Sequence, residues 1–368
     1  MGDNGRAEAM RALDAALATN DVESRRKKFE GAGCDIKIKD LSMACMKEIP
    51  HTKDSKISAM GWGHSEDDHR LVVCDQAGAC FVWDSVRNNR MYGCIYPFAQ
   101  CVAMHPEKGN TMLLLGGMRN ATVQFKKTAG AVLTEGKTWV QHDGYISSVA
   151  FLPGKPDHYV SASGDADIRV FSIAAPVTEN VGILRGHQKD AQCIKFNPVN
   201  NNAFITCSSD KTVKMWDLRT NGCVQTHTTD AELNGCCLSP DGNLIACGGE
   251  KDKTYVFDTR AYKRVGIYAR NNMKTASTCF SKSGRILYVG HDDGAIISWD
   301  IFGSGENKAY AKKTIAHEKH EDDNNHAPID ITRSRVQCLE VSPLGYLASG
   351  GFDGKVKLWK YAPPPKAK

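Results

Sequence analysis

The sequence predicts an all-β fold of repeated units, preceded by an N-terminal α-helix. Three observations support this prediction. Short apolar runs separated by turn residues fill most of the 368 residues, an aromatic residue recurs at a nearly constant interval, and the residues before 30 are rich in helix formers. With 41% hydrophobic residues, the chain can bury a sizeable core.

The repeat is clearest where an apolar run ends in Trp-Asp, at Trp83, Trp216 and Trp299. Weaker copies end at Phe125, Phe171, Phe257 and Trp359. The aromatic residues are 42, 46, 45, 41, 42 and 60 positions apart. A period of about 40–45 residues with several short strands is typical of a WD-repeat blade. The sequence therefore predicts a seven-bladed WD-repeat β-propeller, in which each blade covers the faces of its neighbours.

A ring of blades needs a closure. In such propellers the last blade commonly takes one strand from the other end of the chain, and residues 34–39 alternate as a strand does. We therefore expect the propeller to span residues 34–361, with residues 362–368 as a flexible tail.

Each blade also has a turn six residues before its aromatic ending, where an Asp can accept hydrogen bonds from backbone amides. The predicted structural turn residues are Asp165, Asp210, Asp293 and Asp353. His142 and His187 are placed to bond toward such an Asp. The other three blades have Ala77, Arg119 and Lys251 at this position, so we expect weaker turns there.

Residues 1–33 form the predicted helical segment, in which Met10, Leu13 and Leu17 line one stripe at heptad spacing. A helix of about 15 residues is marginally stable in water, so another surface must cover the stripe. That surface is either the chain's own propeller or a helix of another protein.

The last and longest interval predicts an insertion at about residues 302–335. It contains the string HEKHEDD, at residues 317–323, which lacks the HExxH spacing that places two histidines on one helical face. We interpret this segment as a solvated loop and predict no metal site.

Composition excludes several classes of function. A net charge of +5 from 47 basic and 42 acidic residues does not indicate nucleic-acid binding. The 14 cysteines include no paired CxxC motifs and lie largely in apolar runs, which predicts reduced thiols in a cytosolic protein. No apolar run approaches the ~20 residues of a membrane span, and Arg6 breaks the myristoylation pattern begun by Gly2. Any membrane attachment is expected through a partner.

No catalytic group stands out. Ser281, Ser283 and Ser342 lack a G-x-S-x-G context, and the Gly-Gly pairs end strands where a phosphate loop would open a helix. The sequence predicts a binding protein without a cofactor.

Specific strings extend the interpretation. KISAMGWG at residues 56–63, VWDS at 82–85, GGMRN at 116–120, HDGY at 142–145 and FSKSGR at 280–285 resemble the beta subunit of heterotrimeric G proteins, in the same order and blades. The resemblance covers nearly the whole chain. It implies a non-enzymatic protein whose N-terminal helix pairs with a gamma subunit, through Met10, Leu13 and Leu17, and whose propeller binds the GDP-loaded alpha subunit and, after its release, effectors. It also implies a cytoplasmic protein held at the inner face of the plasma membrane by its partners.

The resemblance implies a set of alpha- and effector-binding residues: Lys56, Arg90, Phe98, Met118, Asn120, Tyr145, Asp190, Glu232, Asn234, Glu250 and Phe352. Other positions of that surface depart from the family: Ser58 replaces Tyr, Ala79 replaces Lys, Asp54 replaces Leu, and Gln100 and Gln192 replace Met. Either the alpha partner has changed to match, or the surface prefers another ligand.

Our hypothesis for this surface is that Phe98, Tyr145 and Phe352 anchor the partner while Lys56 and Arg90 attract its acidic groups. The alternative function is a general WD-repeat scaffold of another cytosolic complex, without a gamma subunit. The N-terminal helix distinguishes the two, because a scaffold acting alone does not need it.

Overall fold

The computed structural model describes residues 42–51, 55–64, 69–107, 112–270, 272–301, 311–315 and 335–362. Within these ranges every regular element is a β-strand, β1 to β28, which confirms the all-β prediction there. No helix in them is long and apolar enough to cross a membrane. The predicted helical segment, with Met10, Leu13 and Leu17, lies outside the described residues.

The strands form four-stranded antiparallel blades, numbered here along the chain. Blade 1 contains β2 (Ile57–Trp62), β3 (Arg70–Asp75), β4 (Ala79–Asp84) and β5 (Asn89–Ile95). Blade 2 contains β6 (Ala99–Met104), β7 (Met112–Gly117), β8 (Ala121–Ala129) and β9 (Val132–Val140). Blade 3 contains β10 (Ile146–Leu152), β11 (Lys155–Ser163), β12 (Ile168–Ser172) and β13 (Gly182–Leu184).

The remaining blades follow the same order. Blade 4 contains β14 (Ala191–Phe196), β15 (Ala203–Ser208), β16 (Thr212–Asp217) and β17 (Gly222–Thr228). Blade 5 contains β18 (Leu233–Leu238), β19 (Leu244–Gly249), β20 (Lys253–Asp258) and β21 (Lys263–Ala269). Blade 6 contains β22 (Thr275–Phe280), β23 (Ile286–His291), β24 (Ala295–Asp300) and β25 (Ala311–Ile315). Blade 7 contains β26 (Val336–Val341), β27 (Leu347–Gly351), β28 (Lys355–Ala362) and β1 (Ser42–Pro50).

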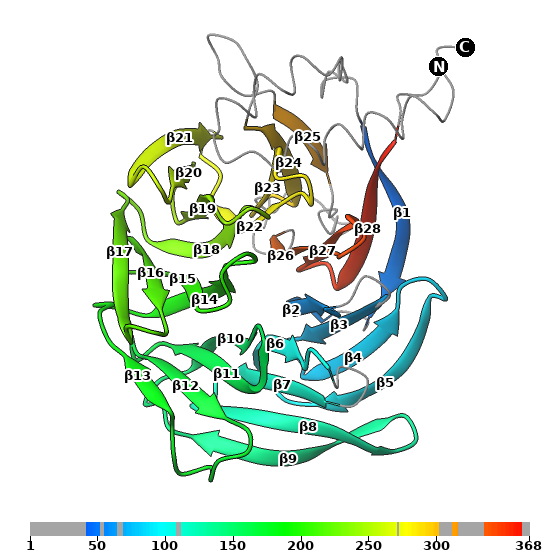
Figure 1. Ribbon diagram of the computed structural model, residues 1–368. Coiled ribbons are helices and arrows are strands. Elements are labelled where there is room, and N and C mark those ends of the chain that lie inside the picture. The colour runs from blue at the N-terminus through cyan, green and yellow to red at the C-terminus, as the bar shows by residue number, and fades with distance from the viewer. Residues whose placement is uncertain are drawn as a thin grey trace, which may run out of the picture.

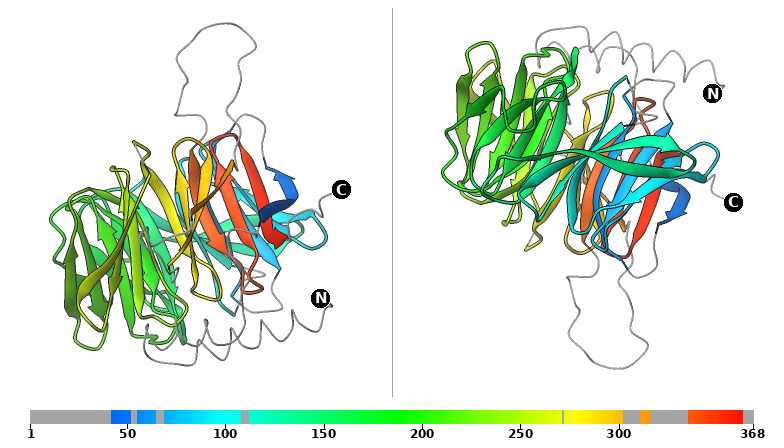
Figure 2. Two further views of the ribbon diagram at one scale, coloured as in Figure 1. Left: turned by 90° about the horizontal axis from the view of Figure 1, so that it is seen from above. Right: turned by 90° about the horizontal axis from the view of Figure 1, so that it is seen from below.

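The first strands of the blades form a closed ring. Each contacts the first strand of the next blade, in the order β2, β6, β10, β14, β18, β22, β26 and back to β2. Figure 1 shows the blades arranged around the common axis, and Figure 2 shows the ring from two sides. The described residues therefore form a seven-bladed β-propeller.

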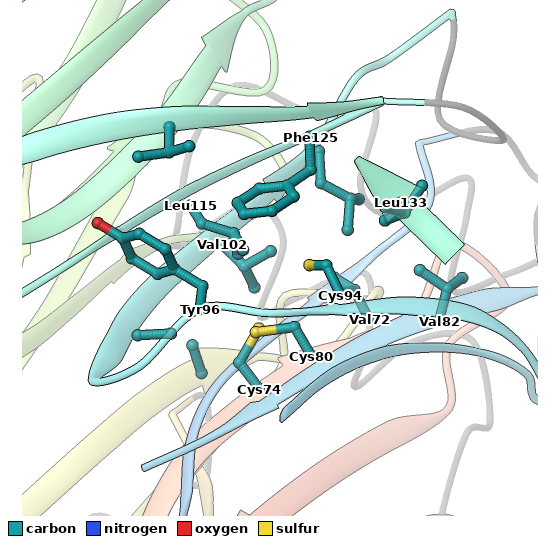
Figure 3. Packing of buried hydrophobic residues seen from close by; sticks show 14 of the residues in the cluster. Val72, Cys74, Cys80, Val82, Cys94, Tyr96, Val102, Leu115, Phe125 and Leu133 are labelled. Atoms are coloured by element: carbon teal, nitrogen blue, oxygen red, sulfur yellow. The ribbon is translucent and has the colours of Figure 1, made fainter. Parts of the chain in front are cut away.

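Apolar side chains fill the space between blades. One buried cluster lies between each pair of neighbouring blades. Figure 3 shows the cluster between blades 1 and 2, where Val72 and Val82 face Leu115 and Phe125. Since each cluster takes residues from two blades, one blade alone leaves both of its faces uncovered.

Strand β1 closes the ring. It pairs antiparallel with β28, from Ser42 opposite Ala362 to Pro50 opposite Lys355. Ile49 of β1 is fully buried against Ile57 and Leu71 of blade 1. The closing strand thus follows residues 34–39, to which the sequence had assigned this role and which lie outside the described residues.

Two features differ from the regular repeat. Residues 302–335 are not one loop, because β25 lies within them and pairs with β24 as the outer strand of blade 6. The HEKHEDD string lies outside the described residues. In blade 2, the long hairpin β8–β9 crosses the outside of the ring, as Figure 2 (right) shows, and joins blade 1 by one parallel pair, Gly93 with Val132. Blades 1 and 2 are therefore one sheet.

Candidate functional site

The most complete turn network lies in blade 4. His187 bonds through Nδ1 to Asp210 Oδ2 (2.8 Å) and through Nε2 to Thr206 Oγ1 (2.7 Å), and Trp216 Nε1 donates to the same hydroxyl (2.8 Å). Burial alone raises the pKa of Asp210, but the hydrogen bonds from His187 and Thr212 outweigh it and hold this pKa well below its usual range. This network ties the turn to the Trp that ends the blade.

The other turn aspartates use variants of this arrangement. In blade 3, His142 Nδ1 lies 2.8 Å from Asp165 and its Nε2 lies 2.7 Å from Ser161. In blade 6, Arg270 replaces the His at the same spacing and donates two hydrogen bonds to Asp293. Asp353 of blade 7 accepts from the Lys355 amide (3.1 Å).

The blades without a turn Asp have substitutes. In blade 5 the charges are reversed. Lys251 stands at the turn position and donates to Asp230 (3.3 Å), which lies where the other blades have their His or Arg. In blade 2 the Arg119 guanidinium lies 5.9 Å from the centre of the Tyr96 ring. In blade 1 Asp75 accepts from the Ala79 amide (2.9 Å), two residues before the expected position.

A β-bulge at the second residue recurs in the first strand of every blade. The pairing shifts at Ser58, Gln100, Ser147, Gln192, Asn234, Ala276 and Gln337. A bulge places two residues opposite one and redirects a side chain. The bulges lie at the end of the ring where fourth strands connect to first strands and where the turns between second and third strands lie. We call this end the bulge face.

The structure brings nearly all the predicted partner-binding residues to the bulge face. Those that precede a first strand, belong to it, or follow a second strand are Lys56, Phe98, Met118, Asn120, Tyr145, Asp190, Glu232, Asn234, Glu250 and Phe352. The exception is Arg90, which lies near the start of β5 at the outer edge of blade 1, with its guanidinium 3.4 Å from the centre of the Phe81 ring.

Phe98 and Met118 form an exposed apolar pair on the bulge face, with 61% and 58% of their surface accessible. Phe98 has a φ of 60°, a conformation that side-chain-bearing residues rarely adopt. Its carbonyl accepts from the Met118 amide (3.2 Å), and a Cβ on Gly117 would lie 2.1 Å from that oxygen. The backbone therefore holds the Phe98 ring in solvent beside Met118, at a cost in strain that is typical of functional sites.

Tyr145 is more enclosed. Its hydroxyl donates to Asp190 Oδ2 (2.9 Å) and accepts from Gln192 Nε2 (3.1 Å), and Gln192 also reaches Ser209 Oγ (3.2 Å). Burial, together with the Asp190 acceptor, raises the pKa of the Tyr145 hydroxyl. Gln192, one of the positions that differ from the G-protein beta-subunit pattern, thus holds the Tyr145 hydroxyl within this face.

Charged residues of the bulge face are paired between neighbouring blades. Lys189 bonds to Glu232 (3.1 Å), and Glu250 accepts from Asn234 (2.9 Å) and Lys274. These pairs are partly exposed, so each contributes less than about 1 kcal/mol to stability.

The ring of Phe352 lies close to two cationic side chains. Lys56 Nζ is 4.6 Å and Arg335 Cζ is 5.9 Å from the centre of its ring, and Arg335 also pairs with Asp292 (3.5 Å). The sequence reasoning missed Arg335. Its place before the first strand of blade 7, as Lys56 precedes that of blade 1, was the available signal.

The other positions that differ from the G-protein beta-subunit pattern are less prominent. Ser58 is buried and donates to the Cys74 carbonyl (3.2 Å), and Ala79 begins β4. Gln100 bonds through Nε2 to Met118 Sδ (2.9 Å). Asp54 lies outside the described residues.

Comparison with known proteins agrees with this geometry. The model of the WD domain, G-beta repeat, matches residues 178–217, 220–258 and 327–360, which carry parts of blades 3, 4, 5 and 7. The matched residues carry WD repeats, and their described strands lie within the seven-bladed ring.

At the level of the whole chain, the similarity is to "Guanine nucleotide-binding protein subunit beta" of plants. The Zea mays and Oryza sativa subsp. japonica proteins are each 23% identical over 98% of this chain and 94% of their own length. The Arabidopsis thaliana protein is 22% identical over 98% of this chain and 93% of its own. The chain is thus similar to these plant beta subunits over nearly its whole length, at low identity.

Proposed function

We propose that the chain is the non-catalytic beta subunit of a heterotrimeric G protein. In this proposal its N-terminal segment pairs with a gamma subunit, and its bulge face binds the GDP-loaded alpha subunit. Release of the alpha subunit then exposes that face to effectors. The complex works in the cytoplasm at the inner face of the plasma membrane, held there by its partners.

The observation that carries the proposal is the similarity to beta subunits over nearly the full length, combined with the exposed pair Phe98 and Met118 on the bulge face. An exposed apolar pair beside the charge pairs of this face supplies the kind of anchor that dominates interface energy. Phe98 and Met118 are the primary anchors of this proposal, since the Tyr145 hydroxyl already bonds within the chain and Phe352 is covered by Lys56 and Arg335.

The proposal is tested by purifying the tagged chain from its own cells, once with GDP and once with a non-hydrolysable GTP analogue. A small helical chain in both samples and an alpha subunit only with GDP are expected. If neither is recovered, the chain is a WD-repeat scaffold of a different complex.

A point variant tests the binding face directly. Phe98→Ala is expected to weaken alpha binding about 30-fold, as a hot-spot loss of ~2 kcal/mol does. The matched control is Tyr262→Ala, because Tyr262 is 67% exposed with a φ of 54° but lies between β20 and β21, at the other end of the ring. Equal binding by both variants would contradict the assignment of Phe98.

A further inference from the structure

A cluster of three thiols lies where blades 4 and 5 meet. Cys193 of β14 is paired directly with Cys207 of β15, and its Sγ lies 3.7 Å from the carbonyl oxygen of Cys236 in β18. Directly opposed residues of antiparallel strands have Cα atoms about 4.5–5.5 Å apart. Disulfides span Cα separations of about 4.4–6.8 Å, so the Cα separation of an opposed pair suits a disulfide between Cys193 and Cys207.

The members of this cluster differ in access. Cys207 and Cys236 are 0% and 1% exposed, whereas Cys193 is enclosed by strands yet retains accessible surface. Of the three residues, Cys193 is therefore the one with surface open to a small oxidant.

A cation lies beside Cys193. Lys195 is two positions along the same strand, so its side chain leaves β14 on the same face. Its ammonium donates to Glu340 of β26, on blade 7, at 2.5 Å, and this ion pair links blades on opposite sides of the ring. The S–H groups of Cys207 and Cys236 hold the pKa of the Cys193 thiol well below its usual range, and Lys195 acts in the same direction.

We propose that Cys193 is an oxidant-sensitive thiol and that Cys207 is the thiol that resolves it to a disulfide. Accessible cysteines with thiolate character, poised next to a second thiol, are the ones that hydroperoxides oxidise.

The chemistry needs only a hydroperoxide. The Cys193 thiolate attacks one oxygen of hydrogen peroxide, an S–O bond forms, the O–O bond breaks, and hydroxide leaves and is protonated to water. The Cys207 sulfur then attacks the Cys193 sulfenic acid, an S–S bond forms, the S–O bond breaks, and a second water carries away the Cys207 proton. Two thiols are oxidised and one peroxide is reduced to two waters.

Blade 1 provides an internal control. Cys74 of β3 lies opposite Cys80 of β4, and Cys80 lies opposite Cys94 of β5. Figure 3 labels these three side chains. They are 0%, 0% and 5% exposed, and the charge that acts on both Cys74 and Cys80 is the Asp75 carboxylate. Burial and Asp75 raise the pKa of Cys74. These three cysteines are thus opposed as Cys193 and Cys207 are, but they have neither the exposed surface of Cys193 nor, in the described part of the chain, a lysine beside them.

The test treats the purified full-length chain with hydrogen peroxide and maps every cysteine by peptide mass spectrometry without reduction. A Cys193–Cys207 disulfide is expected, while Cys74, Cys80 and Cys94 stay reduced. In Cys207→Ser, dimedone, a reagent for sulfenic acids, is expected to label Cys193. Lys195→Met is expected to slow the oxidation of Cys193 about tenfold, as an upward pKa shift of about one unit does. Because Lys195 is partly exposed, this variant tests the proposal even if Cys207→Ser does not fold.

Three results would overturn the proposal. One is a Cys193 that stays reduced while the exposed Cys45 and Cys223 react. The second is oxidation of the blade 1 row at the same rate as Cys193, which would show that opposed cysteines suffice. The third is a Cys193–Cys236 link, which would assign the resolving role to the other blade.

Discussion

Replacing Asp210 with Ala should strongly destabilise blade 4. The carboxylate accepts four hydrogen bonds: from His187 Nδ1 (2.8 Å), the Gln188 amide (3.0 Å), the Thr212 amide (2.9 Å) and Thr212 Oγ1 (2.6 Å). The side chains of His187 and Asp210 are 0% and 5% exposed. At about 1 kcal/mol for each lost bond, the expected loss is ~4 kcal/mol, which agrees with the cost of about 3–5 kcal/mol for removing one partner of a buried pair.

The matched variant is Lys251→Ala, at the same turn position of blade 5. The side chains of Lys251 and Asp230 are 51% and 48% exposed, so their ion pair contributes less than about 1 kcal/mol. Hydrogen exchange of the turn amides suits this comparison, because it reads each blade separately and does not need two-state unfolding of the ring. Faster exchange by two to three orders of magnitude is expected at Gln188 and Thr212 in Asp210→Ala, and little change around residue 251 in Lys251→Ala. A Lys251→Ala effect as large as that of Asp210→Ala would refute the reasoning.

Three further predictions follow from the same geometry. Acid should destabilise blades 3 and 4, because hydrogen bonds lower the pKa of Asp165 to about 2 and that of Asp210 further, against 3.8 in an unfolded chain. A lowered folded-state pKa gives stability that is complete above about pH 4 and is lost as the pH falls toward 2. Urea midpoints that do not change between pH 5 and pH 2.5 would contradict this prediction. Gly164→Ala should weaken partner binding at the bulge face, because its Cβ would lie 2.5 Å from Tyr145 Cε1; a binding assay with Gly182→Ala, whose Cβ meets its nearest atom at 3.4 Å, is the control. Deleting residues 1–50 removes β1 and should open the ring between blades 7 and 1, seen as a larger radius by small-angle scattering; an unchanged radius would show that β1 is dispensable.

The repeat could be predicted from the sequence because the residues that specify each blade lie close together in the chain. Apolar alternation, turn residues and the recurring aromatic each act within one blade, so Trp83, Trp216 and Trp299 sufficed to indicate the period. The same holds for Asp165 and Asp210, whose His partners lie 23 residues earlier in the same repeat. The closing strand was harder to place, because residues 34–39 alternate as a strand does, and only the pairing with β28 shows that β1 has this role.

The arrangement of the bulge face was only partly predictable. The resemblance to G-protein beta subunits supplied Phe98, Tyr145 and Phe352, but it gave no indication that the Tyr145 hydroxyl is bound by Asp190 and Gln192. Nor did it show that a bulge recurs at the second residue of each first strand. A bulge is a property of the register between two strands, and a single strand's sequence does not encode that register.

By itself, then, the sequence determined the blade, its period, its turn residues and the number of blades, because each depends on contacts between residues close in the chain. Only the tertiary structure decided which side chains share the bulge face, which thiols oppose each other, and that Lys195 of blade 4 meets Glu340 of blade 7. Those contacts join residues that are far apart in the chain, and the closing of the ring brings them together.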